Sequence, residues 1–167
     1  MLFYIYFILA SSFKTLFFSV DPSIRVIYHP QTKKVTRSGF TKKMNGYVFE
    51  QRITVINTKS SVIKDVKVQE QIPVSEDSTI SVNLISPPLI MPETSKSGKP
   101  TASGPVNLGG GVVAQWEGTD EPETDPELLG KDGKLSWICS LPAQGKINIL
   151  LSWEVVYPSG SNVYGLD

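Results

Sequence analysis

The sequence is poor in the side chains that most often carry chemistry. It has one cysteine, Cys139, and one histidine, His29, among 167 residues. A single cysteine cannot form a disulfide within the chain, and one cysteine with one histidine is too few for a zinc site. A Ser-His-Asp or Cys-His site would have to use His29, which we expect at the surface. The sequence therefore predicts no catalytic residue, no metal site and no cofactor.

The chain also lacks an excess of either charge. Lysine plus arginine and aspartate plus glutamate each total 16, so the formal net charge is zero. Nucleic-acid-binding domains usually show a basic excess, so no nucleic-acid partner is expected. The charges form a basic stretch of Lys33, Lys34, Arg37, Lys42 and Lys43, and an acidic stretch of Glu117, Asp120, Glu121, Glu123, Asp125 and Glu127. We expect two solvated loops, with a contact between them or with a partner as the alternative.

No hydrophobic run near the N-terminus is long enough to cross a membrane as a helix. The run Leu2–Ala10 is apolar but too short to span a bilayer as a helix. Ala10 and Ser12 would suit cleavage of a signal peptide, although no basic residue precedes the run. Residues 1–12 are thus a signal or anchor, or else core material. A cytoplasmic location is favoured, and secretion or membrane attachment is the alternative.

What the sequence has is period-two alternation of apolar and polar side chains. Residues 47–55, 62–72 and 79–84 alternate in this way, which predicts three strands of an antiparallel layer, each with one buried and one wet face. Gln51 falls on an apolar face and needs hydrogen-bond partners if it is buried. In the second run the apolar face carries Val62, Val66, Val68 and Ile72, and the opposite face carries Asp65, Lys67 and Gln69.

Strand and turn signals also flank this stretch. Residues 24–29 read as a short strand between two prolines. Residues 31–45 are polar and basic and run into Asn45-Gly46, a strong turn dipeptide. We expect a hairpin or loop there.

The C-terminal part has the longest alternation. Leu135, Trp137, Cys139 and Leu141 share one face, so Cys139 reads as a small buried apolar residue. After a hairpin-sized turn at 142–145, six consecutive odd positions are apolar: Ile147, Ile149, Leu151, Trp153, Val155 and Tyr157. We expect this hairpin to be a major part of the core.

The fold class that fits these signals is all-β. About seven short strands and no convincing helix predict an antiparallel β-sandwich. We expect one domain at 16–167, preceded by an apolar segment at 1–15. Residues 86–132 are rich in proline and glycine and read as a long insertion or mobile loop, in which residues 112–116 form one short strand.

One turn is the candidate interaction site. A strand ends at Pro73, and Val74, Ser75, Glu76 and Asp77 lead to the next strand. Ser75 and Asp77 side chains are suited to bond turn backbone, which favours a structural corner between two sheets. The functional alternative is a turn for partner recognition or phosphorylation.

Three segments resemble a known family. They are FFSVDPSIRVIYHPQTKKVTRSGF, EQRITVINTKSSVIKDVKVQEQIPVSEDSTISVNLISP and GKLSWICSLPAQGKINILLSWEVVYPSG. Together with Gly165-Leu166 they resemble the C-terminal β domain of the mucoidy-inhibitor-A-like family of uncharacterised proteins, domain of unknown function 4139. The likeness covers roughly residues 16–166 and is loose within 90–130.

The resemblance implies a β domain that follows a coiled-coil region, and no catalytic residue. The coiled coil and the first portion of the β domain are missing from this chain, and Met1–Phe13 does not resemble the family. We therefore expect a fragment or a shortened gene model with exposed strand edges, which are prone to pair with other chains.

The leading hypothesis is a non-enzymatic protein-interaction or scaffold module with a protein partner, or with self-association through its strand edges. The second is a secreted or membrane-attached carbohydrate-binding module that uses Trp116, Trp137 and Trp153 for sugar stacking. A hydrolase is the third.

Overall fold

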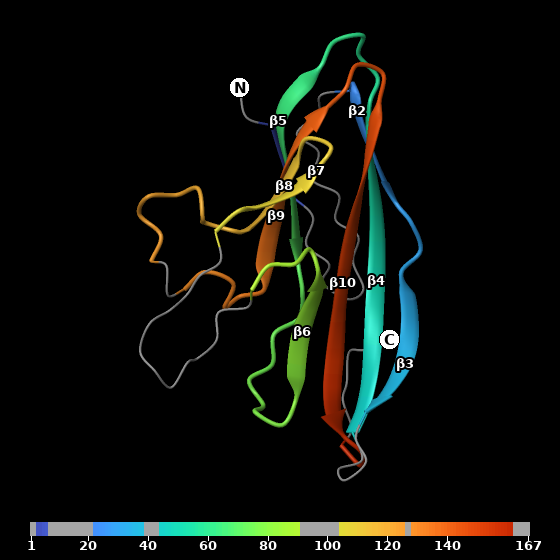
Figure 1. Ribbon diagram of the computed structural model, residues 1–167, viewed down its shortest axis with the longest axis vertical. Coiled ribbons are helices and arrows are strands. Elements are labelled where there is room, and N and C mark those ends of the chain that lie inside the picture. Colours follow the sequence, from blue (N-terminus) through green and yellow to red (C-terminus); the bar gives the residue numbers. More distant parts are fainter. Residues whose placement is uncertain (1–2, 7–21, 39–43, 91–103, 126–127, 162–167) are drawn as a thin grey trace.

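The structure is a computed structural model that describes residues 3–6, 22–38, 44–90, 104–125 and 128–161. Within these ranges the chain forms strands and no helix (Figure 1). The strands are β1 Phe3–Tyr6, β2 Ile24–Tyr28, β3 Thr32–Ser38, β4 Met44–Asn57, β5 Ile63–Gln71, β6 Ser81–Ser86, β7 Val106–Gly109, β8 Val112–Trp116, β9 Lys134–Leu141 and β10 Lys146–Pro158. A search of the described residues for a helix long and apolar enough to cross a membrane finds none.

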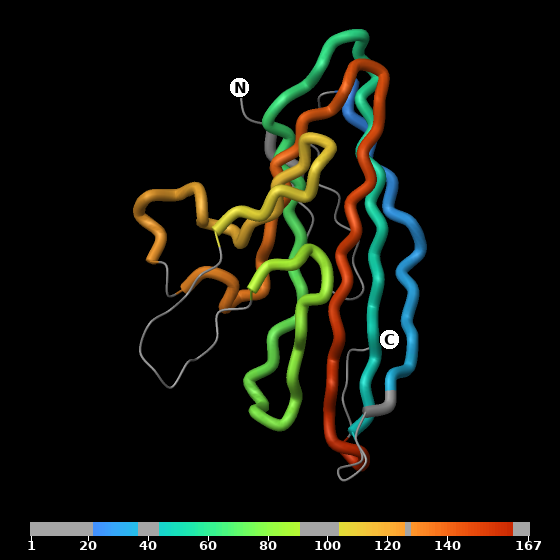
Figure 2. The backbone as a smooth tube through the Cα atoms, in the orientation of Figure 1, coloured from blue at the N-terminus to red at the C-terminus, as the bar shows by residue number. Residues whose placement is uncertain are grey.

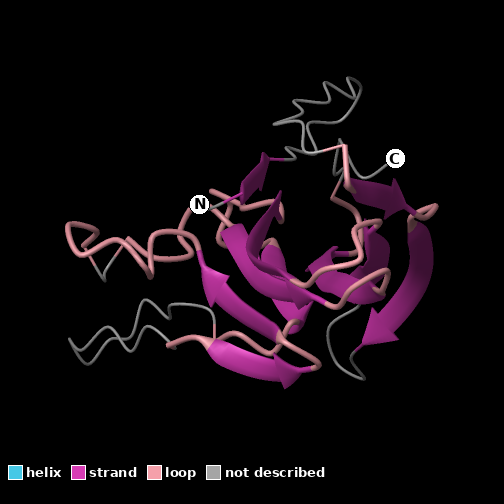
Figure 3. Ribbon diagram, turned by 90° about the horizontal axis from the view of Figure 1, so that it is seen from above, coloured by secondary structure: helices cyan, strands magenta, loops and turns pink. Residues whose placement is uncertain are grey.

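The strands form two sheets, as predicted for a β-sandwich. The β9 sheet has the order β1-β5-β9-β8-β7, and the β10 sheet has the order β2-β4-β10-β6. β3 also belongs to the β10 sheet, because β2 and β3 pair with successive parts of the same strand, β4. Seen from above, the strands lie around a common interior (Figure 3).

Consecutive strands repeatedly change sheet, which corrects two predictions. β4, β5 and β6 do not form one layer, because β5 lies in the β9 sheet and β10 separates β4 from β6. β9 and β10 are not a paired hairpin either, because their connection leads from one sheet to the other (Figure 2). Alternation identifies the buried face of a strand but not its hydrogen-bonded neighbour.

The core lies between the inward faces of β9 and β10 and their neighbours. The predicted faces are confirmed, since each of their members is at most 8% exposed: Leu135, Trp137, Cys139, Leu141, Ile147, Ile149, Leu151, Trp153, Val155 and Tyr157. Gln51 is also buried, and its Nε2 donates to the carbonyl oxygens of His29 at 2.7 Å and Arg52 at 3.1 Å. The predicted need for partners is thus met by the backbone.

The start of β5 corrects the predicted face of the second run. Val62 is 56% exposed, whereas Ile63 is buried. The ladder between β5 and β9 shifts register between Ile63 and Val66, and Asp65 has a φ of 59°. The extra residue, in the left-handed region, forms a β-bulge. Alternation before the bulge is therefore out of step with alternation after it, so Ile63 and not Val62 faces inward with Val66.

The dipeptide Asn45-Gly46 is not a turn. Both residues lie inside β4, where Asn45 pairs with Arg37 and Gly46 with Thr36 of β3. A Cβ at Gly46 would collide with Thr36 Oγ1, so glycine serves the close approach of two strands here. Of the hairpin or loop predicted over 31–45, the hairpin is confirmed, because β3 pairs antiparallel with the next strand, β4. Its turn does not use Asn45-Gly46, and the connection at 39–43 lies outside the described residues.

The insertion at 86–132 is more ordered than predicted. The expected strand is confirmed as β8, and β7 precedes it. β8 pairs with β9, and Ala114 and Trp116 are completely buried. Residues 106–116 therefore belong to the sandwich, because alternation in β8 places its small and aromatic side chains in the core. Residues 91–103 and 126–127 lie outside the described part.

Trp153 provides a test of the core. It is 6% exposed and stacks on Phe49 with ring centroids 5.4 Å apart. We expect Trp153→Ala to lower the free energy of unfolding by about 3–5 kcal/mol, measured by urea denaturation, because a large cavity remains. Leu150→Ala on the same strand, where Leu150 is 43% exposed, should cost less than about 1 kcal/mol. Unchanged stability of the tryptophan variant would contradict the assignment.

Candidate functional site

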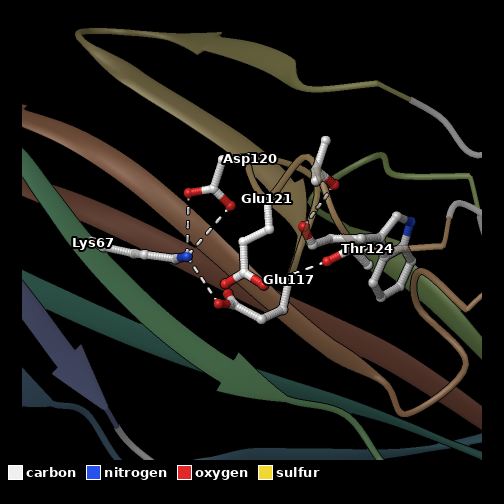
Figure 4. A network of polar contacts seen from close by, with 7 residues as sticks. Lys67, Glu117, Asp120, Glu121 and Thr124 are labelled. Atoms are coloured by element: carbon white, nitrogen blue, oxygen red, sulfur yellow. Dashed lines mark hydrogen bonds and ion pairs between the residues drawn. The ribbon is translucent and has the colours of Figure 1, made fainter.

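A buried lysine forms ion pairs with two carboxylates. Lys67 lies on the outer face of β5 with its side chain only 2% exposed. Its Nζ is 2.8 Å from Glu117 Oε1 and 3.4 Å from Asp120 Oδ2. The two carboxylates come from the segment after β8, fifty residues away in the chain (Figure 4). We call Lys67, Glu117 and Asp120 the Lys67 cluster.

A series of tight turns presents the two carboxylates. The Thr119 hydroxyl donates to the carbonyl oxygen of Trp116 at 2.7 Å, and Glu121 N donates to the carbonyl oxygen of Gly118 at 3.0 Å. Gly118 has a φ of 88°, a conformation that favours glycine. Thr124 N then donates to the carbonyl oxygen of Glu121 at 3.1 Å. These local bonds hold the segment in a shape that directs Glu117 and Asp120 towards β5.

Electrostatics keep Lys67 protonated. Burial alone lowers the pKa of Lys67, but its hydrogen bond and ion pair with Glu117, together with Asp120, raise the pKa above its ordinary value. A protonated amine has no lone pair for nucleophilic or base chemistry. The cluster therefore acts as an ionic link between β5 and the segment that follows β8.

The Lys67 cluster corrects two expectations. The outer face of β5 was predicted to be wet, yet Lys67 is buried. Glu117 and Asp120 are not freely solvated, and their contact is with β5 rather than with the basic stretch. In the basic stretch Lys34 pairs with Glu50 at 3.3 Å on an exposed surface. Lys42, Lys43 and Glu127 lie outside the described residues.

A row of buried polar side chains crosses the outer face beside the cluster. Gln69, Ser136 and Gln115 are paired across β5, β9 and β8. Gln115 and Ser136 are 4% and 0% exposed. Within the described part of the chain, Gln69 Oε1, Ser136 Oγ, Gln115 Nε2 and Glu117 Oε2 have no hydrogen-bond partner. Burial of polar atoms without partners is costly.

The opposite face of β5 carries a second buried ionisable group. Glu70 is completely buried between the sheets and accepts a hydrogen bond from the Tyr28 hydroxyl of β2. Burial raises the pKa of Glu70 from 4.5 to about 7, although the bond from Tyr28 opposes the rise. Burial, followed by the charge of Glu70 and their hydrogen bond, raises the pKa of Tyr28. This pair is a polar link across the sandwich.

The predicted turn at 73–77 connects the two sheets, because it lies between β5 and β6. All five residues are exposed. Asp77 N donates to Ser75 Oγ at 3.2 Å, and Asp77 Oδ1 accepts from Thr79 N at 2.8 Å and from Thr79 Oγ1 at 2.7 Å. The two bonds from Thr79 lower the pKa of Asp77. The structural role is thus visible, and partner recognition or phosphorylation stays a prediction.

The other singled-out residues are engaged in packing. His29 is half-buried, not fully at the surface, because its Nε2 lies 2.8 Å from Thr54 Oγ1. Burial raises the pKa of Cys139 to about 12, which makes it a poor nucleophile. Trp116, Trp137 and Trp153 are at most 6% exposed and form no surface for sugar stacking. Within the described ranges no three His, Cys, Asp or Glu residues are grouped to hold a metal ion.

The comparisons with known proteins agree with this β domain. A family model described as domain of unknown function (DUF4139) matches residues 19–159. The chain belongs to this family. Protein F37C4.5 of Caenorhabditis elegans is 37% identical over 68 residues, which are 41% of this chain and 12% of the worm protein. No solved structure matches the chain significantly. The likeness to mucoidy-inhibitor-A-like proteins stays a prediction.

The sequence alone could predict the burial of one of the two buried ionisable residues of β5, Glu70, but not that of Lys67. Glu70 lies in step with Val66, Val68 and Ile72, so its place on the apolar face follows from alternation, as it did for Gln51. Lys67 gave no such signal, because its burial depends on Glu117 and Asp120 far along the chain.

Removal of the Lys67 ammonium tests the ionic link. We expect Lys67→Met to lower the free energy of unfolding by about 3 kcal/mol, because it leaves the partly buried Glu117 carboxylate without its cation. Amide hydrogen exchange at Glu121 and Thr124 should accelerate. The matched control is Lys34→Met, which breaks an exposed pair and should cost less than about 1 kcal/mol. Equal losses in the two variants would contradict the link.

Glu70 predicts a pH dependence of stability. Between pH 4.5 and about 7 the folded state holds a proton on Glu70 that the unfolded state releases. Stability therefore falls as pH rises through this window, by about 3 kcal/mol in total. Glu70→Gln should remove this component, so the variant gains stability relative to the parent from pH 5 to pH 8. A parallel pH profile for Glu70→Gln and the parent would refute it.

Proposed function

We propose that this DUF4139 domain is a non-enzymatic protein-interaction or scaffold module and that β6 is its contact edge. β6 is the last strand of the β10 sheet, and it pairs with β10 on one side. Among the described strands none pairs with its other side. An unpaired strand edge presents backbone donors and acceptors to which an extended segment of a partner can add. This open edge is the observation that carries the proposal.

The side chains of β6 support the proposal. Ser81, Asn83 and Ile85 are exposed, and Ile85 is 49% exposed despite being apolar. The turn at 73–77 leads directly into this strand, with Ile80 N bonded to the carbonyl oxygen of Asp77 at 3.0 Å. Residues 73–79 are all exposed, and along β6 exposed residues then alternate with half-buried ones up to Ile85.

The buried ionisable groups also favour a structural domain. Lys67 is neutralised by two carboxylates, Glu70 is bonded to Tyr28, and Cys139 is surrounded by core residues. Each of these groups has a structural role that accounts for its presence. None is arranged in the described structure as a nucleophile beside a base.

A charge on the edge strand tests the proposal. The tagged full chain, with wild-type β6 or with Ile85→Lys, is used to capture partners from cells of its source, and bound proteins are quantified by mass spectrometry. We expect a partner that binds the parent and loses at least tenfold with Ile85→Lys, because a lysine on an edge strand opposes pairing. The matched control is Leu108→Lys, since Leu108 is 43% exposed on β7 of the other sheet.

Two results would overturn the proposal. One is partner capture that falls equally with Ile85→Lys and Leu108→Lys, or with neither. The other is a measured turnover by the parent chain that a single substitution abolishes while the fold stays intact.

A further inference from the structure

β5 has the burial of an interior strand. Val66 and Val68 on its inner face are 0% exposed, and Lys67 on its outer face is 2% exposed. β9 pairs with one side of β5. The backbone N–H and C=O groups along the other side of β5 need hydrogen-bond partners of their own, either water or a further strand. In the described structure a further strand lies along this side.

The occupant in the structure is β1. Phe3 pairs with Val66, Tyr4 with Lys67, Ile5 with Val68 and Tyr6 with Gln69. The two strands run parallel, whereas the other strand pairs in the described structure are antiparallel. A parallel ladder of four residues is a weak attachment, so β1 can leave this edge at low cost.

β1 lies outside the part of the chain that defines the family. The family model matches residues 19–159, a range that contains β2 to β10 and leaves out Phe3–Tyr6. The nine strands inside the match form both sheets without β1. The strand that completes the β9 sheet thus comes from outside the family match, as a separate chain segment added to its edge.

The number of residues between β1 and β2 limits how far apart the two strands can lie. Seventeen residues, from 7 to 23, separate the end of β1 from the start of β2. A segment of this length spans at most about 60 Å when extended. Exchange between two copies breaks one β1–β5 ladder and forms the same ladder again. The exchange therefore costs little free energy beyond the entropy of association.

We propose that the β5 edge is a strand-acceptor site and that copies of this chain exchange β1 across it. Phe3–Tyr6 of one copy pairs in parallel with Val66–Gln69 of the second, in the register seen within one chain. The site is distinct from the β6 edge, which lies in the other sheet. The exchange therefore does not depend on the proposed function.

Mixed cysteine variants of the full chain test the exchange. Tyr6→Cys and Gln69→Cys, carrying different tags, are mixed and oxidised, so that a disulfide between the two tags forms only between copies. Paired positions on neighbouring strands lie within the Cα separation that a disulfide needs, and the native Cys139 is buried. The control mixture pairs Tyr6→Cys with Ser81→Cys on exposed β6. We expect at least tenfold more mixed disulfide with Gln69→Cys than with Ser81→Cys.

The double variant Tyr6→Cys/Gln69→Cys makes every result decisive. If it forms a disulfide within one chain and the mixture gives no more product than the control, β1 stays on its own copy and the exchange is refuted. If neither the double variant nor the mixture crosslinks, β1 does not occupy the β5 edge and the proposal also fails.

Discussion

The ladder between β4 and β10 is the constraint on which the rest of the sandwich depends. It pairs thirteen residues of each strand, from Lys146 opposite Ile56 to Pro158 opposite Met44. β2 and β3 add to the other side of β4, and β6 adds to the other side of β10. The inward face of this long ladder, with Ile53 and Trp153 at its centre, is the surface against which the β9 sheet packs. Without this ladder the apolar face of the β9 sheet would have no surface to pack against.

Two ionisable side chains are buried on opposite faces of β5. Glu70 faces inward and is bonded to Tyr28, whereas Lys67 faces outward and is bonded to Glu117 and Asp120. A buried charge is tolerated when it is paired, and its loss leaves the partner uncompensated. The two links therefore act in different directions, one joining the two sheets and the other fastening the segment after β8.

The edges of the two sheets give the domain its opportunities for contact. The β6 edge is open on one side, and the β5 edge is filled by a short parallel strand from outside the family match. Edge strands are the places where a sheet can grow by pairing with another chain. In the proposed function, the backbone of β6 holds the partner, and side chains such as Ile85 decide which partner fits.

The sequence by itself determined the all-β class and the buried faces of β4, β9 and β10, because a strand places alternate side chains on opposite sides. It also placed the single cysteine in the core. Local chemistry was enough for the 73–77 turn, where Ser75, Asp77 and Thr79 bond within a few residues.

Only the tertiary structure decided which strands are neighbours and which polar groups are buried. The pairing of β10 with β4 and β6 depends on contacts between segments that are distant in the chain. Alternation does not predict which strands pair. The bulge at Asp65 reversed the predicted exposure of Val62, because one extra residue puts the residues before the bulge out of step with those after it. Lys67 is buried because Glu117 and Asp120 arrive from a segment fifty residues away, and charge pairing at that separation in sequence exists only once the sheets have formed.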